Sequence, residues 1–238
     1  MEVRINKYLA EAGVASRRQS DKLVESGLVT INGNKAKTAD KVMPGDVVCV
    51  KGKKICRPDE KHVVAFYKPR GVTCTQKDKY AKVTIEDVFR YPIRLNYAGR
   101  LDKDSEGLLI MTNDGELIDC MMRARNYHEK EYVVKVKEKI TDDFIIKMSE
   151  GVHLDELEVQ TRPCKVTKVG DYTFCIILTQ GLNRQIRRMC SALGYRVVSL
   201  LRIRIMNIEI GSLKPGEYRR IEGEERRLLY EQAGLEIK

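Results

Sequence analysis

Residues 99–115 read GRLDKDSEGLLIMTNDG, a short apolar run flanked by acids and glycines. The apolar run, residues 108–111, is bounded by turn-forming residues, which predicts a buried strand. Asp102 lies just before this strand, beside an arginine and between Gly99 and Gly107. Glycine permits backbone angles and close approaches that other residues do not. We therefore take Asp102 as the first candidate for a catalytic residue.

Other interpretations of these acids follow from the residues alone. The acidic stretch resembles the first half of a calcium-binding loop, but Asn113 stands where the twelfth-position Glu is required, so we reject that interpretation. Asp102, Asp104 and Asp114 could instead hold magnesium in a metal-dependent nuclease. Asp102 could also be purely structural, satisfying a turn or pairing with Arg100. The residues by themselves leave the nuclease, structural and catalytic interpretations open.

The composition favours a globular protein with a polyanionic partner. The 238 residues are 42% hydrophobic and 33% charged, and the net charge of +10 favours a nucleic acid. The apolar runs are too short to span a bilayer and Met1 is not followed by a secretory signal, so we expect a cytoplasmic protein without a membrane segment. Seven cysteines without a C-x-x-C pair, and three histidines, predict reduced thiols and no structural zinc site.

Residues 4–26 predict two short helices. Ser16 and Gln19 have the spacing of a capping box at the start of the second helix. Arg17 and Arg18 then fall in its first turn, where each cation costs only tenths of a kcal/mol. A requirement for phosphate contact would outweigh that cost, although two solvated arginines remain an equally simple interpretation.

Strand-like pieces with Asn-Gly and Pro-Gly turns follow over residues 28–50. By position and pattern, residues 1–56 resemble the S4 RNA-binding domain, in which two helices and a hairpin grip structured RNA. The resemblance is carried by Arg4 to Leu9, Ser16 to Arg18, Gly27 to Gly33 and Pro44 to Val48. Residues 57–62, which are polar and contain Pro58, are the expected linker to a second domain over residues 63–238.

The second domain shows a mixed pattern of helices and strands. Strands are expected over residues 63–67, 108–111, 131–136, 158–168 and 172–179 and within 195–210, and helices over 84–90, 116–125, 142–148, 182–193 and 222–233. The segments 158–168 and 172–179 alternate enough to be paired with each other.

The helix expected over residues 182–193 is amphipathic. At about 100° per residue, Arg184 and Arg188 point nearly opposite the apolar face, whereas Arg187 falls at the edge of that face. An arginine there needs a partner, because an unpaired charge is costly to desolvate. Residues 181–204 contain six arginines and no acid, which favours a phosphate-binding surface over an ordinary solvated face.

Four motifs resemble, in order, those of the RsuA/RluB/RluE/RluF family of pseudouridine synthases. They are Lys68 to Gly71; Gly99 to Asp102 with Ser105, Gly107 to Leu109 and Thr112 to Gly115; Lys130 to Tyr132; and Gly181 to Met189. The last motif, with His128 to Tyr132 and Arg204 to Asn207, is most similar to the RluF branch, which acts on 23S ribosomal RNA. The resemblance covers nearly the whole chain and favours the catalytic interpretation of Asp102.

The resemblance implies an α+β protein, with a small S4 domain followed by a catalytic domain whose mixed, largely antiparallel β-sheet is flanked by helices. It implies site-specific isomerisation of uridine to pseudouridine in folded RNA, either 23S ribosomal RNA or an assembling large ribosomal subunit, with a transfer RNA as a further candidate. An isomerisation requires no metal or other cofactor, and we expect a monomer. A non-catalytic RNA-binding or ribosome-assembly factor on the same fold is the alternative.

The resemblance also implies roles for individual residues. The target uridine must be flipped out of folded RNA before its glycosidic bond can be reached. Asp102 would act as an ionised carboxylate, either as nucleophile or as base, while Tyr132 would stack on the base and Arg187 would pair with Asp102. The candidate RNA-binding residues are basic members of the S4 module and of the motifs: Arg4, Lys7, Arg17, Arg18, Lys68, Arg100, Lys130, Arg184, Arg188, Arg202 and Arg204.

Overall fold

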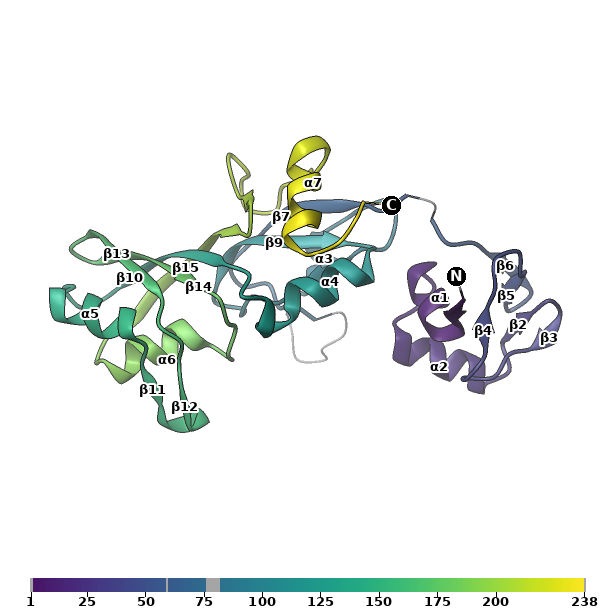
Figure 1. The fold of residues 1–238 in the computed structure, drawn as a ribbon, viewed down its shortest axis with the longest axis horizontal. Coiled ribbons are helices and arrows are strands. Elements are labelled where there is room, and N and C mark those ends of the chain that lie inside the picture. Colours follow the sequence, from purple (N-terminus) through teal and green to yellow (C-terminus); the bar gives the residue numbers. More distant parts are fainter. Residues whose placement is uncertain (1, 59, 76–81, 238) are drawn as a thin grey trace. The chain divides into compact units, whose positions relative to one another are not determined.

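The computed structural model describes residues 2–58, 60–75 and 82–237, so residue 59 of the expected linker lies outside the described residues. The chain forms two compact units (Figure 1). The first comprises residues 1–62, 91–96 and 113–115, and the second comprises residues 63–90, 97–112 and 116–238. Within the described ranges, no helix combines the length and apolar character needed to cross a membrane.

The first unit contains the two predicted helices, α1 (Ile5–Glu11) and α2 (Arg17–Glu25). The predicted capping box is present: the Ser16 hydroxyl accepts a hydrogen bond from the Gln19 N–H at 3.3 Å, and the Ser16 N–H donates to Gln19 Oε1 at 3.2 Å. These bonds satisfy N–H groups that the start of a helix otherwise leaves without partners. Arg17 and Arg18 are therefore held on the exposed first turn of α2.

Short strands complete the first unit. A four-stranded sheet has the order β3 (Asn34–Lys35), β2 (Val29–Ile31), β5 (Val48–Val50) and β6 (Lys53–Ile55), while β1 (Val3–Arg4) pairs with β4 (Lys41–Val42). Asn32 and Gly33, between β2 and β3, have φ of 51° and 84°. Two consecutive positive φ values are what a two-residue hairpin turn requires, so the predicted Asn-Gly turn is confirmed.

A nine-stranded sheet forms the frame of the second unit. Seven strands follow the order β13 (Lys165–Gly170), β14 (Thr173–Leu178), β10 (Lys130–Val136), β15 (Val197–Ile205), β9 (Glu106–Thr112), β7 (Val63–Lys68) and β17 (Tyr218–Arg220); β8 (Asn96–Ala98) pairs with β9, and β16 (Ile208–Glu209) pairs with β15. The β15–β9 pair is parallel, and the other pairs along this path are antiparallel. The expected mixed, largely antiparallel sheet is thus confirmed.

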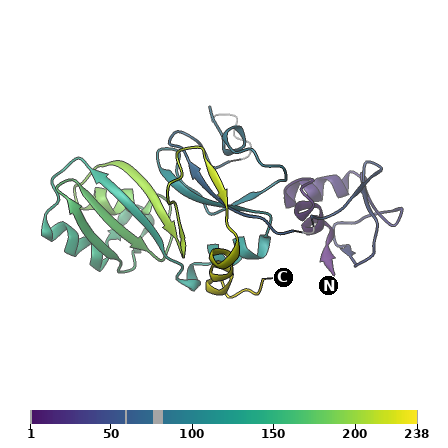
Figure 2. The same ribbon diagram turned by 90° about the horizontal axis from the view of Figure 1, so that it is seen from above.

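Helices cover the two halves of this sheet separately (Figures 1 and 2). Helices α4 (Gly115–Met122) and α7 (Gly223–Gln232) pack on the half around β7 and β9, with Leu117 and Leu229 in the apolar core. Helices α5 (Asp142–Glu150) and α6 (Gln185–Ala192) pack on the half around β10 and β14, with Phe144 and Met189 in a second core. The short helix α3 (Ile85–Val88) follows β7. Helix α6 is thereby positioned beside the face of β10 and β15.

Some predicted boundaries are wrong. The segment 158–168 is not one strand: β12 (Val159–Gln160) pairs with β11 (His153–Leu154) across a 3-10 turn (Asp155–Leu157), and only β13 pairs with β14. The strand is interrupted after residue 160, because Thr161 turns into the domain: it is buried, and its hydroxyl accepts a hydrogen bond from the Val152 N–H at 2.8 Å. The helix expected to 125 ends at 122 and is followed by a 3-10 turn (Ala124–Asn126).

Candidate functional site

A cavity of about 430 Å³ opens in the second unit, bordered by the segment before β9, by α6 and by β10 and β15. Its volume is within the range of small-molecule sites, about 300–1,000 Å³. Seven predicted site residues line it: Arg100, Asp102, Lys130, Tyr132, Arg184, Arg187 and Arg202. Apolar side chains, among them Leu178, Ile186 and Leu200, complete the lining. The cavity brings together segments that lie far apart in the sequence.

The loop that carries Asp102 is fixed from inside the domain. The Ser105 N–H donates to the Asp102 carbonyl at 3.1 Å, and the Gly71 N–H donates to the Lys103 carbonyl at 2.6 Å. Lys68 is fully buried, and its ammonium donates to the Ser105 carbonyl and to two carbonyls of its own loop at 2.8 to 2.9 Å. Burial lowers the pKa of Lys68. Its prediction as an RNA-binding residue is wrong, because a fully buried ammonium cannot reach a phosphate.

Gly107 explains why the loop needs a glycine at the start of β9. Its φ is +111°, and a Cβ there would lie 2.3 Å from the carbonyl oxygen of Arg202 and 2.7 Å from its nitrogen. Such distances are sterically impossible for a side chain next to fixed backbone. The close approach of β9 to β15 therefore depends on this glycine, as the sequence suggested.

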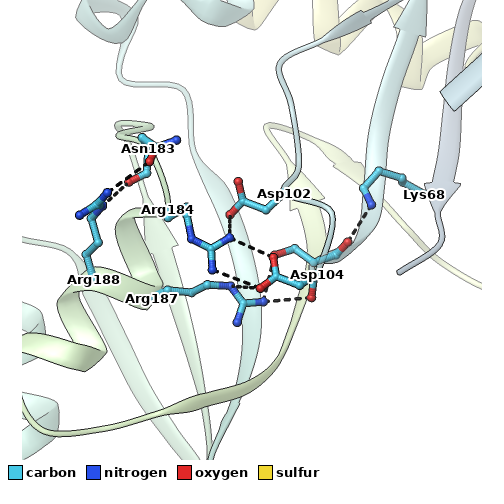
Figure 3. A network of polar contacts seen from close by, with 8 residues as sticks. Lys68, Asp102, Asp104, Asn183, Arg184, Arg187 and Arg188 are labelled. Carbon is cyan, nitrogen blue, oxygen red and sulfur yellow. Dashed lines mark hydrogen bonds and ion pairs between the residues drawn. The ribbon is translucent and has the colours of Figure 1, made fainter. Parts of the chain in front are cut away.

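Two arginines of the α6 region hold the loop from the other side (Figure 3). Arg184 donates to both carboxylate oxygens of Asp104, at 3.1 and 3.2 Å, and its Nη1 lies 3.7 Å from Oδ2 of Asp102. Arg187 donates to the Asp104 carbonyl at 3.0 Å and to the Ser105 hydroxyl at 3.3 Å, and its Nε lies 3.4 Å from the Asp104 carboxylate. We call Asp102, Asp104, Arg184 and Arg187 the paired wall of the cavity.

The paired wall differs from the expected Asp102–Arg187 ion pair. Among the described residues, Asp102 pairs with Arg184, whereas Arg187 pairs with Asp104. Arg184 has a left-handed backbone with φ of 51°, just before α6, which aims its side chain over the loop. Arg187 is one turn further along and mostly buried, so it meets the second acid. The sequence suggests Asp104 only as a metal ligand, and the sign that could have indicated this pairing is its position two residues after Asp102.

The charges of the paired wall stabilise one another. Burial alone would raise the pKa of Asp104, but the hydrogen bond from Arg184 and the charge of Arg187 outweigh it, so the pKa is lowered. The hydrogen bond to Asp104 raises the pKa of Arg184, whereas burial lowers the pKa of Arg187. Asp104 is consequently ionised at neutral pH and keeps two guanidinium groups beside Asp102.

Lys130, Tyr132 and Arg202 line the cavity from the strands β10 and β15. Lys130 and Tyr132 alternate along β10, and Arg202 on β15 is the ladder partner of Tyr132. Arg202 is only 2% exposed, and its Nε donates to the Leu108 carbonyl at 2.7 Å. Arg202 is therefore placed at the cavity and not on the outer surface of the domain, and its binding to RNA stays a prediction.

Other predicted RNA contacts are occupied by acids of the chain itself. Arg204 pairs with Glu129 at 2.9 Å and with Glu131 at 2.8 Å, and Arg188 forms an ion pair with Glu156. The absence of acids from residues 181–204 suggested free cations, but strand pairing brings acids from other segments. In the first unit, Lys7 pairs with Glu11 at 3.7 Å and Arg4 donates to the Thr38 carbonyl at 3.5 Å.

The nuclease interpretation requires a group of metal-binding carboxylates. Across the part of the chain that the structure describes, no three His, Cys, Asp or Glu side chains are placed to hold a metal ion together. Asp104 is instead neutralised by arginines, as described above. The acids therefore do not assemble the donor set that the nuclease interpretation needs.

Comparison with known proteins identifies the family. The RNA pseudouridylate synthase family matches residues 62–192, and the S4 domain family matches residues 3–48. The chain is 45% identical to the dual-specificity RNA pseudouridine synthase RluF of Escherichia coli (strain K12), over 94% of this chain and 77% of that protein. It is 34% identical to the ribosomal large subunit pseudouridine synthase B of Bacillus subtilis (strain 168), over 92% and 91% of the two chains.

A solved structure agrees with these relatives. The fold matches a crystal structure of a pseudouridylate synthase with a TM-score of 0.70 and 29% identity, covering 95% of this chain and 99% of that chain. The chain therefore belongs to the RNA pseudouridine synthase family, with an S4 domain at its N-terminus. The family resemblance, the fold class and the class of enzyme expected from the sequence are confirmed.

Proposed function

We propose that this pseudouridine synthase isomerises a uridine in large-subunit (23S) ribosomal RNA, free or in an assembling subunit. The carrying observation is the cavity that Asp102 and Tyr132 both line, with Arg184 beside the Asp102 carboxylate. The substrate follows from similarity to relatives, one of which is named for the large ribosomal subunit. The relative with 45% identity is named for a dual specificity, and a transfer RNA is our candidate for a second substrate.

Asp102 is the catalytic residue of this proposal. Arg184 lies beside it, with Nη1 at 3.7 Å from the Asp102 carboxylate, and Arg187 is bound to the same loop through Asp104. The flipped uridine enters the cavity and its base stacks on Tyr132, because an aromatic face accepts any base. Asp102 then starts cleavage of the glycosidic bond, either by attacking the sugar or by removing a proton, and both routes need the ionised form.

The rest of the chain serves RNA binding in this proposal. Residues 1–56 act as the S4 RNA-binding domain, residues 57–62 as a linker and residues 63–238 as the catalytic domain. Arg17 and Arg18 contact phosphate, since they are exposed and form no ion pair among the described residues. Arg100, at the cavity, contacts the RNA beside the flipped nucleotide. We propose a cytoplasmic monomer.

Substitution of Asp102 by Asn tests the catalytic assignment. Pseudouridine formation in ribosomal RNA should fall by about 10,000-fold or more, because the carboxylate takes part in bond cleavage. RNA affinity should stay near that of the wild type, since the substitution leaves the basic residues in place. Asp119→Asn is the matched control, because Asp119 is an exposed acid on α4 that pairs with Arg123.

Two outcomes would overturn the proposal. An active Asp102→Asn variant would remove Asp102 from the chemistry. Wild-type protein that makes no pseudouridine in any ribosomal or transfer RNA offered would favour a binding or assembly factor on the same fold. Mapping pseudouridines in cells with and without the protein identifies the uridine that it modifies.

A further inference from the structure

Two cations that line the cavity from the sheet, Lys130 and Arg202, have no acid of their own among the described residues. Lys130 donates a hydrogen bond to the His128 carbonyl at 3.2 Å, and Arg202 donates to the Leu108 carbonyl at 2.7 Å. Within the described residues neither forms an ion pair, and Nη2 of Arg202 is buried without a hydrogen-bond partner. We call Lys130 and Arg202 the unpaired wall. It differs from Arg184, Arg187, Arg188 and Arg204, each of which meets an acid.

The unpaired wall is unfavourable for the folded protein. Arg202 is 2% exposed, and a buried charge without a counter-charge is costly. Burial and the nearby charge of Arg202 lower the pKa of Lys130 to about 8. The lowered pKa shows that the charged form of Lys130 is also unfavourable in the folded protein. A negatively charged species in the cavity, which both residues line, would supply the missing counter-charge.

The proposed reaction generates such a species. When the bond between C1′ and N1 breaks, the electron pair leaves with the base, and the negative charge spreads over N1 and the two carbonyl oxygens. When C1′ bonds to C5 instead, the proton on C5 is lost and N1 gains a proton. Atoms and electrons balance without an oxidant, a reductant or a cofactor. The detached uracil is therefore an anion for as long as it is turned within the cavity.

We propose that Lys130 and Arg202 form an anion site that stabilises the departing uracil. The inference rests on the proposed reaction at Asp102 and adds a second electrostatic function to the same cavity. The paired wall holds the loop that carries Asp102, and the unpaired wall receives the negative charge that leaves with the base. Fixed cations aimed at developing charge are the usual way in which a protein lowers such a barrier.

The position of the unpaired wall favours the base over a phosphate as its ligand. Lys130 and Arg202 flank Tyr132, the residue on which we place the base, and all three belong to the paired strands β10 and β15. Arg202 is enclosed at the sheet, whereas a nucleotide phosphate stays on the solvent side of a flipped base. The more exposed cations of the cavity, such as Arg184, are better placed for phosphate.

Lys130→Met tests the inference, because it removes the charge while keeping an unbranched side chain. The single-turnover rate of pseudouridine formation should fall by about 100-fold. RNA affinity should stay within about twofold, since no phosphate contact is lost. Lys130→Arg, which keeps a cation, should retain more activity than Lys130→Met. Lys135→Met is the matched control on the same strand, because Lys135 is exposed and outside the cavity.

A more acidic base distinguishes leaving-group stabilisation from other roles. The ring nitrogen of 6-azauridine withdraws electrons, so its base leaves more readily as an anion, while C5 keeps its proton. On RNA that carries 6-azauridine at the target position, the rate defect of Lys130→Met should shrink by about tenfold or more relative to uridine. The thermal stability of Lys130→Met should equal or exceed that of the wild type, because an uncompensated cation has been removed.

Four results would overturn the inference. An equal defect on both RNAs would show that Lys130 does not act on the leaving group. A defect confined to RNA affinity would assign Lys130 to a phosphate, and a large loss of stability would make its role structural. If wild type is active and Lys130→Met matches it, only this inference fails. If wild type is inactive, or Asp102→Asn is active, the proposed function itself fails.

Discussion

The two walls of the cavity solve the problem of buried charge in opposite ways. In the paired wall, Asp104 receives hydrogen bonds from Arg184 and an ion pair from Arg187, so each charge has a fixed partner. In the unpaired wall, Lys130 and Arg202 lie side by side without an acid among the described residues. The first arrangement stabilises the fold and orients Asp102. The second sacrifices stability, and the missing charge has to come from the bound substrate.

Gly107→Ala should have the largest effect, because Gly107 is where the loop of the paired wall meets the strand of the unpaired wall. The new Cβ would lie 2.3 Å from the Arg202 carbonyl oxygen, and φ is +111°. We expect a loss of about 4 kcal/mol or more in the free energy of unfolding, measured by chemical denaturation. Gly170→Ala is the control, since no atom lies within 4 Å of its added Cβ. A loss of less than about 1 kcal/mol for Gly107→Ala would contradict the close approach of β9 to β15 at this residue.

Lys130→Met should stabilise the protein. Lys130 has its pKa lowered from 10.5 to about 8 by burial and by Arg202, and this shift corresponds to about 3 kcal/mol at most. Below pH 8 the lysine is charged in the folded and unfolded states, so the whole penalty is present in the wild type. Between pH 8 and 10.5 the folded protein loses this proton first, so the advantage of Lys130→Met shrinks. Denaturation at pH 7 and pH 10 measures the change, and a constant difference would disprove it.

Asp104→Asn should convert the paired wall into a second unpaired one. Arg187 would lose its acid while remaining 13% exposed, and Arg184 would lose a two-point hydrogen bond. Because the Asp104 side chain is 40% exposed, we discount the cost to about 1–2 kcal/mol of unfolding free energy. The exposed pair of Asp119 and Arg123 provides the control, and Asp119→Asn should cost less than about 0.5 kcal/mol. Equal effects would mean that the paired wall contributes no more than a surface ion pair.

Arg17→Gln with Arg18→Gln should have the smallest effect, because these cations lie outside the cavity. They are exposed and form no ion pair among the described residues. If they contact phosphate, the double variant should weaken RNA binding by about tenfold and reduce the salt slope of affinity by about 2. Arg227→Gln is the control, because Arg227 is exposed but paired with Glu224 and Glu231. An unchanged salt slope would show that the two arginines are merely solvated.

The sequence correctly predicted the structural features that depend only on residues adjacent in the chain. The capping box at Ser16, the Asn32-Gly33 turn and the strand around residues 108–111 each depend on local backbone chemistry, and all three are present. Strand breaks such as the one near Thr161 were missed, because a hydrogen bond to Val152 overrides the local alternation. Lys68 was expected to bind RNA, because nothing in its neighbouring residues indicates that its ammonium donates to three backbone carbonyls inside the domain.

The sequence by itself determined the family, the two kinds of domain and the segments that meet at the site, because motifs and periodicity are written along the chain. Only the tertiary structure decided how the charges are distributed. It paired Arg187 with Asp104, neutralised Arg204 with one acid in a neighbouring strand and one just before it, and left Lys130 and Arg202 without an acid among the described residues. The physical reason is that the energy of a charge depends on its distance from other charges and from water, and strand pairing sets those distances between residues far apart in the sequence.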